Sequence, residues 1–271
     1  MHVLDAGSIR EFAAACDALR VEVVAQTDST NRVLMDSAFG ADPAPPRLLA
    51  ASCQTAGRGR RGRAWISPPG RSIAFSIAFE RRVGSEPPPV AAAVAMGATA
   101  ALTLARWAPD VQLKWPNDLQ RARRKLAGIL LECRRGPAAV RRGGTIERIV
   151  VGTGVNLLAP DEAALSQPAC GLFDDNALPP RAAEAIIGGL AAAFVPAMRQ
   201  FLAEGLGPFV DIWRRFDALD GEQVVVMDNE RALVAGRALG LDDSGGLRVQ
   251  TPHGVQVITS GELSLRRLEP A

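Results

Sequence analysis

Seven consecutive residues of this chain carry four arginines and three glycines. They are Gly57-Arg58-Gly59-Arg60-Arg61-Gly62-Arg63, and Ala64-Trp65 follow directly. Arginine presents a fixed fork of N–H donors that matches carboxylate and phosphate oxygens, while glycine lets the backbone approach a ligand closely. Such a segment suits a loop that closes over an anionic ligand. A solvated run of charge or a nucleic-acid tail explains the segment equally well when it is considered by itself.

Four other clusters of polar residues and glycines lie at the ends of predicted strands. Together with the arginine loop, the clusters cover residues 28–31, 54–65, 114–118, 125–128 and 152–156. Ordinary turns and helix caps explain any one of them, but this explanation must be invoked five separate times. Their cationic and amide groups all suit one kind of ligand, a carboxylate joined to a phosphate. We therefore predict that the five clusters share one site.

Histidine is nearly absent and tyrosine is wholly absent. The two histidines are His2, at the N-terminus, and His253, in a Pro-His-Gly turn. This scarcity disfavours Ser-His-Asp and Cys-His catalysis and also HExxH metal sites. Any chemistry must therefore depend on lysine, arginine, aspartate, asparagine and backbone groups.

Charge and cysteine content narrow the class of protein further. The chain has 31 basic and 29 acidic residues, without the broad basic excess of a dedicated duplex-binding protein. Its four cysteines are far apart and form no CxxC pair, which favours reduced thiols in the cytoplasm. The N-terminus lacks the pattern of a signal peptide. The longest uncharged apolar run, Val90–Ala105, is shorter than the roughly 20 residues that span a bilayer, so we expect a soluble protein.

Hydrophobic periodicity predicts the elements that position these clusters. Strands are expected at 20–26, 47–53, 72–80, 111–115, 126–132 and 149–157. Helices are expected at 8–19, with Ser8 as N-cap, and at 89–106, 181–203 and 208–219, the third interrupted at Pro196. Residues 116–118 and 121–125 are predicted to be turns.

The pattern changes at Gly221 to short strands that are joined by glycine turns. These strands are expected at 223–227, 232–241, 246–251 and 254–258. Four or five short strands in about 47 residues predict a small barrel. We therefore predict two domains, residues 1–220 with the candidate site and residues 221–271 as a partner or clamp module.

Taken in order, several motifs resemble those of the biotin protein ligases. They are DSTN (28–31), GRGRRGRAW (57–65), KWPNDL (114–119), KLAGILLE (125–132), GTGVN (152–156) and, near the C-terminus, GELSLR (261–266). The resemblance runs from about Thr27 to Arg267, nearly the whole chain. The combination of GRGRRGR with KWPNDL is specific, because lipoate and octanoyl transferases share the fold but lack this pair.

The resemblance implies a fold and a reaction. The fold is α+β, with a mixed, largely antiparallel sheet and helices on one face, as in class II aminoacyl-tRNA synthetases, followed by an SH3-like β-barrel. The reaction joins biotin to Mg-ATP to give biotinyl-5′-AMP and pyrophosphate. The biotinyl group then passes to a lysine of the carboxyl-carrier domain of a biotin-dependent carboxylase.

The same resemblance assigns expected roles to individual residues. Lys125 and Arg60 are the expected catalytic residues, and Asp118 is the one expected ligand of Mg²⁺. The expected biotin-binding residues are Ser29, Thr30, Asn31, Gln54, Arg58, Gly59, Arg60, Lys125 and Gly128. The expected ATP- and adenylate-binding residues are Gly57, Arg58, Arg61, Arg63, Trp65, Lys114, Asn117, Asp118 and Asn156.

Repressor-type members of this family carry an N-terminal winged helix, whereas only 26 residues precede Thr27 here. We therefore expect a ligase that neither binds DNA nor represses transcription.

Two alternative functions stay open. A lipoate or octanoate ligase or transferase of the same fold would not need the four-arginine loop, and an RNA-binding module fits poorly with few aromatic residues and a small net charge. The oligomeric state also stays open, with a homodimer as one option.

Overall fold

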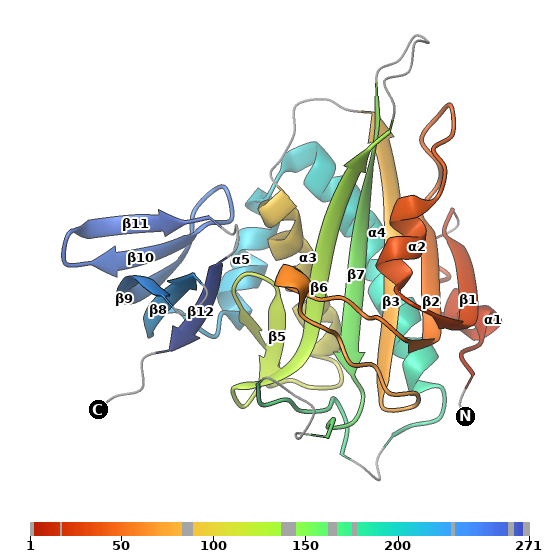
Figure 1. Cartoon of the computed structure of the whole chain (residues 1–271), viewed down its shortest axis with the longest axis horizontal. Helices are drawn as coiled ribbons and strands as arrows, with labels where there is room; N and C mark the ends of the chain where they lie inside the picture. Colours follow the sequence, from red (N-terminus) through yellow and green to blue (C-terminus); the bar gives the residue numbers. More distant parts are fainter. Residues whose placement is uncertain are drawn as a thin grey trace.

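The computed structural model describes residues 3–16, 18–82, 89–136, 145–161, 167–174, 178–228, 231–259 and 263–267. Gly261 and Glu262 of the C-terminal motif lie outside these residues. The chain forms a large sheet with a helical layer and, beyond one end of this layer, a second and smaller sheet (Figure 1).

The large sheet has seven strands in the order β1-β2-β3-β7-β6-β5-β4. Its strands are β1 (Arg20–Thr27), β2 (Arg47–Gln54), β3 (Ser72–Arg82), β4 (Gln112–Lys114), β5 (Asp118–Arg121), β6 (Arg124–Arg135) and β7 (Ile146–Asn156). β1 and β2 pair in parallel, and the other neighbouring strands pair antiparallel. The predicted mixed, largely antiparallel sheet is therefore confirmed.

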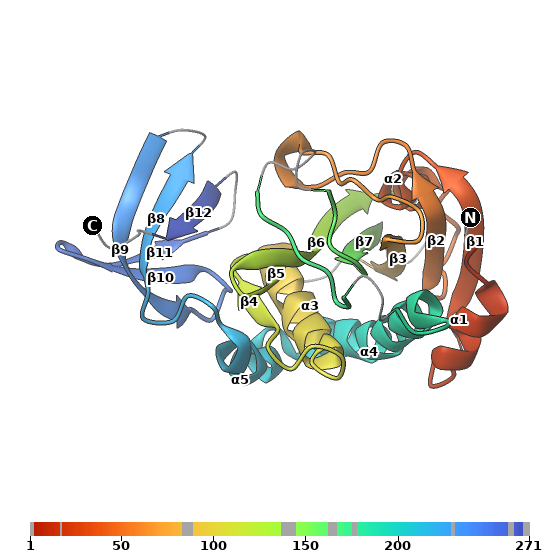
Figure 2. The same cartoon turned by 90° about the horizontal axis from the view of Figure 1, so that it is seen from below.

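Among the described residues, four α-helices cover one face of this sheet, and a fifth lies on the other face (Figure 2). The four are α1 (Ala6–Phe12), α3 (Pro89–Leu104), α4 (Ala182–Glu204) and α5 (Gly207–Phe216). The short helix α2 (Thr30–Asp36) instead packs Leu34 against Leu49, Ala78 and Val150. The predicted helical layer is confirmed, and α2 marks the opposite face as a separate environment.

Strand β3 shows why the two faces of the sheet differ. Successive side chains of a strand point to opposite faces. Ile73, Phe75, Ile77 and Phe79 belong to the main core on the helical side. The alternate positions of β3 from Ser72 to Ala78 carry only small side chains, as in Ala74, Ser76 and Ala78. The sheet therefore has space above it on the side of α2.

The second sheet has the order β11-β10-β9-β8-β12 and is antiparallel throughout its described pairs. Its strands are β8 (Gln223–Asp228), β9 (Arg231–Leu241), β10 (Leu247–Thr251), β11 (Gly254–Ile258) and β12 (Leu263–Arg267). Val224, Leu247 and Val249 are buried in the same core cluster as the large sheet. This small antiparallel sheet agrees with the predicted C-terminal barrel, while the boundary at 220/221 stays a prediction.

The predictions for the first helix and for residues 121–125 are wrong. Asp5, not Ser8, caps α1, because the Asp5 side chain accepts a hydrogen bond from Ser8 N at 2.6 Å, and the helix ends at Phe12. Part of the turn predicted at 121–125 belongs to strands, since β5 pairs with β4 and β6. β5 has too few residues and too little alternation for a strand to be recognised.

Helix α4 continues through Pro196, contrary to the predicted interruption. Proline has no N–H, so the carbonyl four residues earlier, that of Ala192, loses its helical donor. The Cys16 thiol lies 3.8 Å from this carbonyl oxygen and acts as a weak donor to it. Phe194 and Met198 are fully buried on either side of the proline. Tertiary packing therefore outweighs the local preference of proline.

Among the described residues, α4 is the one helix that is long and apolar enough to cross a membrane. Of its most apolar window, 56% is buried inside the protein. Ile186, Leu190 and Phe201 pack in the main core with at most 1% of their surface exposed. α4 therefore has the burial of a core helix.

A buried ion pair connects β3 and β7 on the side of α2. The side chains of Arg148 and Glu80 are 3% and 6% exposed, and Arg148 Nε donates to Glu80 Oε1 at 2.9 Å. The other oxygen of Glu80 accepts from the backbone N–H of Ala44 at 2.9 Å. Both charges are thus paired and hydrogen-bonded, which is the condition for burying them.

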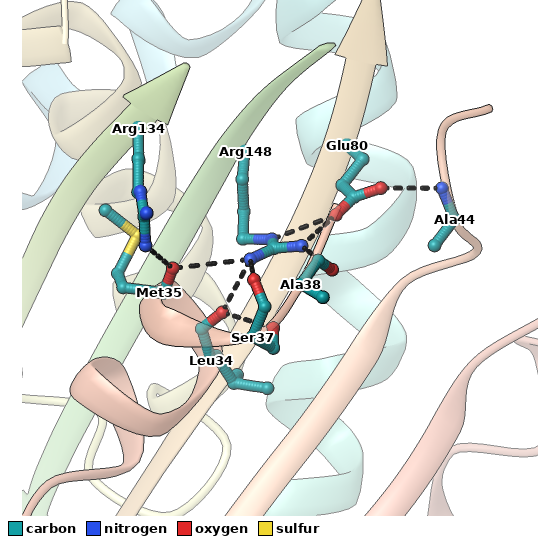
Figure 3. Close-up of polar contacts among 8 residues, drawn as sticks. All are labelled: Leu34, Met35, Ser37, Ala38, Ala44, Glu80, Arg134 and Arg148. Atoms are coloured by element: carbon teal, nitrogen blue, oxygen red, sulfur yellow. Dashed lines mark hydrogen bonds and ion pairs between the residues drawn. The ribbon is translucent and has the colours of Figure 1, made fainter. Parts of the chain in front are cut away.

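The same arginine holds the C-terminal end of α2 (Figure 3). Its guanidinium donates to the carbonyl oxygens of Leu34 at 3.1 Å, Ser37 at 2.6 Å and Ala38 at 3.0 Å. Carbonyls at a helix C-terminus lack partners within the helix and favour a nearby cation. Arg148 therefore determines where α2 ends and, with it, where the first residues of α2 lie.

We expect Arg148→Met to lower the free energy of unfolding by about 3–5 kcal/mol, because it leaves Glu80 buried without its partner. Urea unfolding followed by circular dichroism measures this loss. Arg134→Met is the matched control, since Arg134 also donates to a carbonyl of α2, that of Met35 at 3.0 Å, but is 51% exposed. Its expected loss is at most about 1 kcal/mol. Equal losses in the two variants would contradict the role given to Arg148.

Candidate functional site

A cavity of about 1480 Å³ lies over the large sheet on the side of α2. Its walls are the first turn of α2, the arginine loop, the β4–β5 turn and parts of β2, β3, β6 and β7. All five clusters of the sequence contribute to it. Every predicted site residue except Gly57 lines this cavity.

Gly57 lies at the base of the arginine loop. Trp65 N donates to Gly57 O at 2.9 Å, so the two ends of the loop are joined here. A Cβ at position 57 would lie 2.3 Å from Trp65 O, which no side chain tolerates. The glycine is required by the close approach of two backbone segments, and this separates Gly57 from its neighbours that line the cavity.

The arginine loop is a closed hairpin with a short 3₁₀ turn at Arg60–Gly62. Gly59 N donates to Arg63 O at 2.7 Å, and Arg61 has a positive φ of 61°. Arg61 Nη2 lies 3.9 Å from Asp228 Oδ1 of β8. The loop therefore contacts the C-terminal sheet as well as the cavity.

Arg60 brings a partly desolvated cation to the cavity. Burial lowers the pKa of its guanidinium below the ordinary value, and Arg61 and Arg63 lower this pKa further, while Asp118 raises it. Arginine stays protonated in proteins despite such shifts. Arg60 Nη1 donates to Asn117 Oδ1 at 3.2 Å. A charge with little water around it interacts strongly with an anion.

Lys125 and Asp118 form an ion pair in the same region. Lys125 Nζ lies 2.7 Å from Asp118 Oδ1, and each side chain is 22% exposed. A Cβ at Gly128 would lie 3.3 Å from Lys125 Cε, so glycine at this position leaves room for the lysine. Lys125 Nζ also lies 5.7 Å from the centre of the Trp65 ring. The ammonium group is therefore held between a carboxylate and an aromatic surface.

The indole of Trp65 lies over a gap in β7. A Cβ at Gly154 would lie 2.2 Å from Trp65 Cε2, so only glycine admits the indole here. Among the described residues, the buried indole N–H of Trp65 has no hydrogen-bond partner. Asn156, two residues further along β7, donates from Nδ2 to Lys125 O at 3.4 Å. This end of the cavity offers an aromatic surface, amide groups and a cation.

The opposite end of the cavity has a floor of neutral polar groups that are linked by hydrogen bonds. Gln54 Oε1 accepts from Thr30 N at 2.8 Å, and Thr30 Oγ1 lies 2.7 Å from Ser76 Oγ. Ser76 Oγ donates to Asn31 Oδ1 at 2.6 Å, and Asn31 Nδ2 donates to Glu132 Oε2 at 2.8 Å. Thr30, Asn31 and Ser76 are at most 3% exposed.

Ser29 and Gly152 complete this floor. Ser29 occupies the N-cap position of α2, but its side chain makes no capping hydrogen bond, so capping alone does not account for the serine. A Cβ at Gly152 would lie 2.1 Å from Asn31 Oδ1. The glycine therefore makes space for the asparagine.

Two residues of this hydrogen-bonded network, one in the floor and one beside it, were not predicted from the sequence. Ser76 sits in an apolar strand, where a small side chain is typical of a core residue. Its hydroxyl within this apolar run is the one feature of the sequence that could have indicated a polar site. Glu132 ends the KLAGILLE motif, but no local pattern indicates that it contacts α2 and the arginine loop. Lys114 and Asn117, which were predicted, line the cavity beside Asp118.

Comparison with known sequences identifies relatives over most of the chain. Residues 23–156 match the Biotin/lipoate A/B protein ligase family, and residues 221–266 match the Biotin protein ligase C terminal domain. The Bifunctional ligase/repressor BirA of Salmonella typhimurium is 31% identical, over 99% of this chain and 80% of that protein. The Biotin--[acetyl-CoA-carboxylase] ligase of Paracoccus denitrificans is 31% identical, over 89% of this chain and 98% of that protein.

Solved structures share the fold. The biotin protein ligase of Aquifex aeolicus in complex with biotin and ATP aligns with a TM-score of 0.74 at 24% identity, covering 92% of this chain and 99% of that chain. The biotin acetyl coenzyme A carboxylase synthetase of Helicobacter pylori aligns with a TM-score of 0.56 at 20% identity, covering 88% and 99%. Fold, domain matches and sequence relatives agree, and the chain belongs to the biotin protein ligase family.

Proposed function

We propose that this chain activates biotin with ATP to give biotinyl-5′-AMP and pyrophosphate, and then transfers the biotinyl group to a lysine of a carboxyl-carrier domain. The observation that carries the proposal is the division of one cavity into a neutral, hydrogen-bonded floor and a cationic end. Biotin has the same division, since a cyclic urea lies at one end and a carboxylate at the other.

The neutral floor suits the urea. Buried polar groups of a ligand need hydrogen-bond partners, because each unpaired group costs free energy. Ser29, Thr30, Asn31 and Gln54 supply such partners without a net charge. Arg58 and Gly59 also line the cavity.

The cationic end suits the reaction. A carboxylate that attacks the α-phosphate brings two anions together, and at about 4 Å their repulsion is of the order of 4 kcal/mol with an effective dielectric constant near 20. Lys125 and Arg60 offset this repulsion and stabilise the charge that builds up in the transition state. Asp118 keeps the Lys125 ammonium in place through its 2.7 Å contact.

The nucleotide occupies the remaining walls in this proposal. Trp65 and Asn156 hold the adenine, because an indole surface and a side-chain amide suit a flat base with ring nitrogens. The phosphates lie among the basic and amide groups Arg58, Arg61, Arg63, Lys114 and Asn117. Gly57 supports them only by closing the loop.

The donor set also fits a magnesium ion that arrives with the nucleotide. Among the described residues, no group of three or more His, Cys, Asp or Glu side chains could hold a metal ion alone. Magnesium in nucleotide sites is typically bound by one or two carboxylates and by phosphate oxygens. Asp118 would supply that carboxylate, and the bound ion would neutralise phosphate charge.

The second half of the reaction needs an acceptor lysine and a dry site. A lysine attacks only when it is neutral, and Asp118 is the carboxylate nearest the reacting groups that could take its proton. The arginine loop covers the cavity and keeps water from the mixed anhydride.

The names of the Paracoccus denitrificans and Mycobacterium tuberculosis relatives, both Biotin--[acetyl-CoA-carboxylase] ligase, support a carboxylase carrier domain as the partner. A cytoplasmic location fits this partner.

Incubation with ATP, labelled biotin and an isolated carrier domain tests the whole proposal. The expected result is biotin-dependent release of pyrophosphate and label on one lysine of the carrier. If neither product forms, the ligase reaction is not the function of this chain.

We expect Lys125→Ala to slow adenylate formation by about a hundredfold to a thousandfold, the loss typical of removing one preorganised donor. Pyrophosphate release measures this rate. Arg124→Ala, at the exposed neighbouring position, is the control and should retain the rate. Near-normal adenylation by Lys125→Ala would remove Lys125 from the catalytic role.

Arg60→Ala should shorten the residence time of the adenylate in the cavity by about tenfold or more, because one charge-assisted hydrogen bond is lost. Rapid gel filtration of enzyme loaded with labelled biotin measures the retained fraction over time. The control is Arg32→Ala, which removes an exposed arginine of α2 that pairs with Asp28. Unchanged retention in Arg60→Ala would count against the loop as a lid.

Asp118→Asn should raise the magnesium concentration needed for half-maximal pyrophosphate release by at least about tenfold, a cost typical of losing even an outer-shell group. Asp110→Asn serves as the control, since Asp110 pairs with Arg121 on the surface, where its side chain is 55% exposed. A shift in the biotin requirement alone, with the magnesium requirement unmoved, would show that Asp118 acts only through Lys125.

A further inference from the structure

Glu132 lies where the neutral floor meets the arginine loop, and the proposed reaction gives it no role. Its side chain on β6 is 24% exposed. Oε2 accepts from Asn31 Nδ2 at 2.8 Å, while Oε1 lies 3.2 Å from Arg58 Nη2. One carboxylate therefore contacts both a residue of the floor and a residue of the loop.

Only a carboxylate satisfies both contacts. An ionised carboxylate has two acceptor oxygens and no donor, whereas a side-chain amide has one acceptor and one donor end. Asn31 Nδ2 and Arg58 Nη2 are both donors. A glutamine at position 132 could accept from one of them, but it would turn its own NH₂ group toward the other.

Glu132 also determines the direction of the hydrogen bonds along the floor. Because Asn31 turns Nδ2 toward Glu132, its Oδ1 faces Ser76 and accepts from the Ser76 hydroxyl at 2.6 Å. A serine hydroxyl has a single hydrogen. The Thr30 hydroxyl has two acceptors within reach, Ser76 Oγ at 2.7 Å and Gln54 Oε1 at 3.2 Å. Because Ser76 uses its one hydrogen on Asn31, Thr30 is the donor in the shorter contact. Each donor in this chain of hydrogen bonds points toward Glu132.

This direction decides what the floor presents to a ligand. The hydrogen of Thr30 Oγ1 is used, so its remaining lone pair and that of Asn31 Oδ1 are acceptors. Gln54 accepts from Thr30 N at 2.8 Å through Oε1, so its other terminal group is a donor. A cyclic urea has two N–H donors and one carbonyl acceptor, which is the complementary set.

We propose that Glu132 is a positioning residue that fixes the donor and acceptor pattern of the biotin floor and couples this floor to Arg58 of the loop. This inference rests on the proposed function. It concerns how the site selects a urea, not the chemical step.

A reciprocal exchange of side chains tests the proposal. Glu132→Gln should raise the Kd for biotin, measured by calorimetry without ATP, by about tenfold to a hundredfold. The reason is that the NH₂ group of the new glutamine then faces the N–H donors of either Asn31 or Arg58, so one of the two hydrogen bonds is lost. Asn31→Asp should weaken binding at least as much, since it places two carboxylates in contact. The double variant Asn31→Asp with Glu132→Gln should recover most of the loss. In this variant the new glutamine donates to the carboxylate at position 31 and accepts from Arg58, and that carboxylate still accepts from Ser76.

Steady-state kinetics separate positioning from stability. For Glu132→Gln, KM for biotin should rise far more than kcat falls. Glu147→Gln is the matched control, because Glu147 lies in the same sheet, is 8% exposed and pairs with Arg81 at 2.7 Å, outside the cavity. This control should lower the melting temperature without raising KM for biotin. A rise in the control that equals the rise in Glu132→Gln would assign Glu132 a merely structural role.

Three further results overturn the proposal. They are an unchanged Kd in Glu132→Gln, a double variant no better than its weaker parent, and equal effects of Glu132→Gln in the presence and absence of Arg58. The last comparison uses Arg58→Ala and carries the test if Asn31→Asp does not fold. Failure of the proposed function has a different signature, since the unaltered chain itself would then neither bind biotin nor release pyrophosphate.

Discussion

The space above the middle of the sheet depends on how little side chain β7 carries on one face. Gly152 and Gly154 leave gaps that Asn31 and Trp65 fill from above. On the other face, Val151 and Val155 pack in the main core. Since a strand alternates its faces, a single sequence, VGTGV, closes the core below and opens the cavity above. The alternation of side chains along β7 thus gives both the apolar face that packs in the main core and the open face that carries the site.

Charge is distributed around this space in a way that keeps the two ends of the cavity different. The buried cation of Arg148 lies at the C-terminal end of α2, where its charge is fully used by Glu80 and by helix carbonyls. The residues at the start of the same helix that line the cavity, Ser29, Thr30 and Asn31, are uncharged and belong to the floor. The cations that line the cavity all come from other elements, the arginine loop, β4 and β6. A helix held rigidly at one end therefore presents uncharged groups at the other end with little freedom to rearrange.

The strands were predictable because their apolar residues alternate or run continuously, and the clusters were predictable because polar groups and glycines recur where strands end. Motif resemblance then added that the sheet is mixed and largely antiparallel, with helices on one face. The contacts that turn these clusters into a site could not be predicted in the same way. Glu132 and Asn31 are distant in sequence, and no local pattern encodes the direction of an amide. Ser76 looks like a small core residue, and α4 passes through Pro196 because packing and the Cys16 thiol compensate for the proline.

Trp115 shows how far the influence of the smaller sheet extends. Its indole N–H donates to the carbonyl of Gly245 at 2.9 Å, and Gly245 lies in the turn before β10 with a positive φ of 81°. Trp115 also begins the turn that carries Asn117 and Asp118. A substitution at Gly245, which is buried in the turn before β10, would therefore act on the reacting groups through one indole. The smaller sheet is part of the frame of the active cavity, and exchanging it for the sheet of a distant relative would require a matching turn.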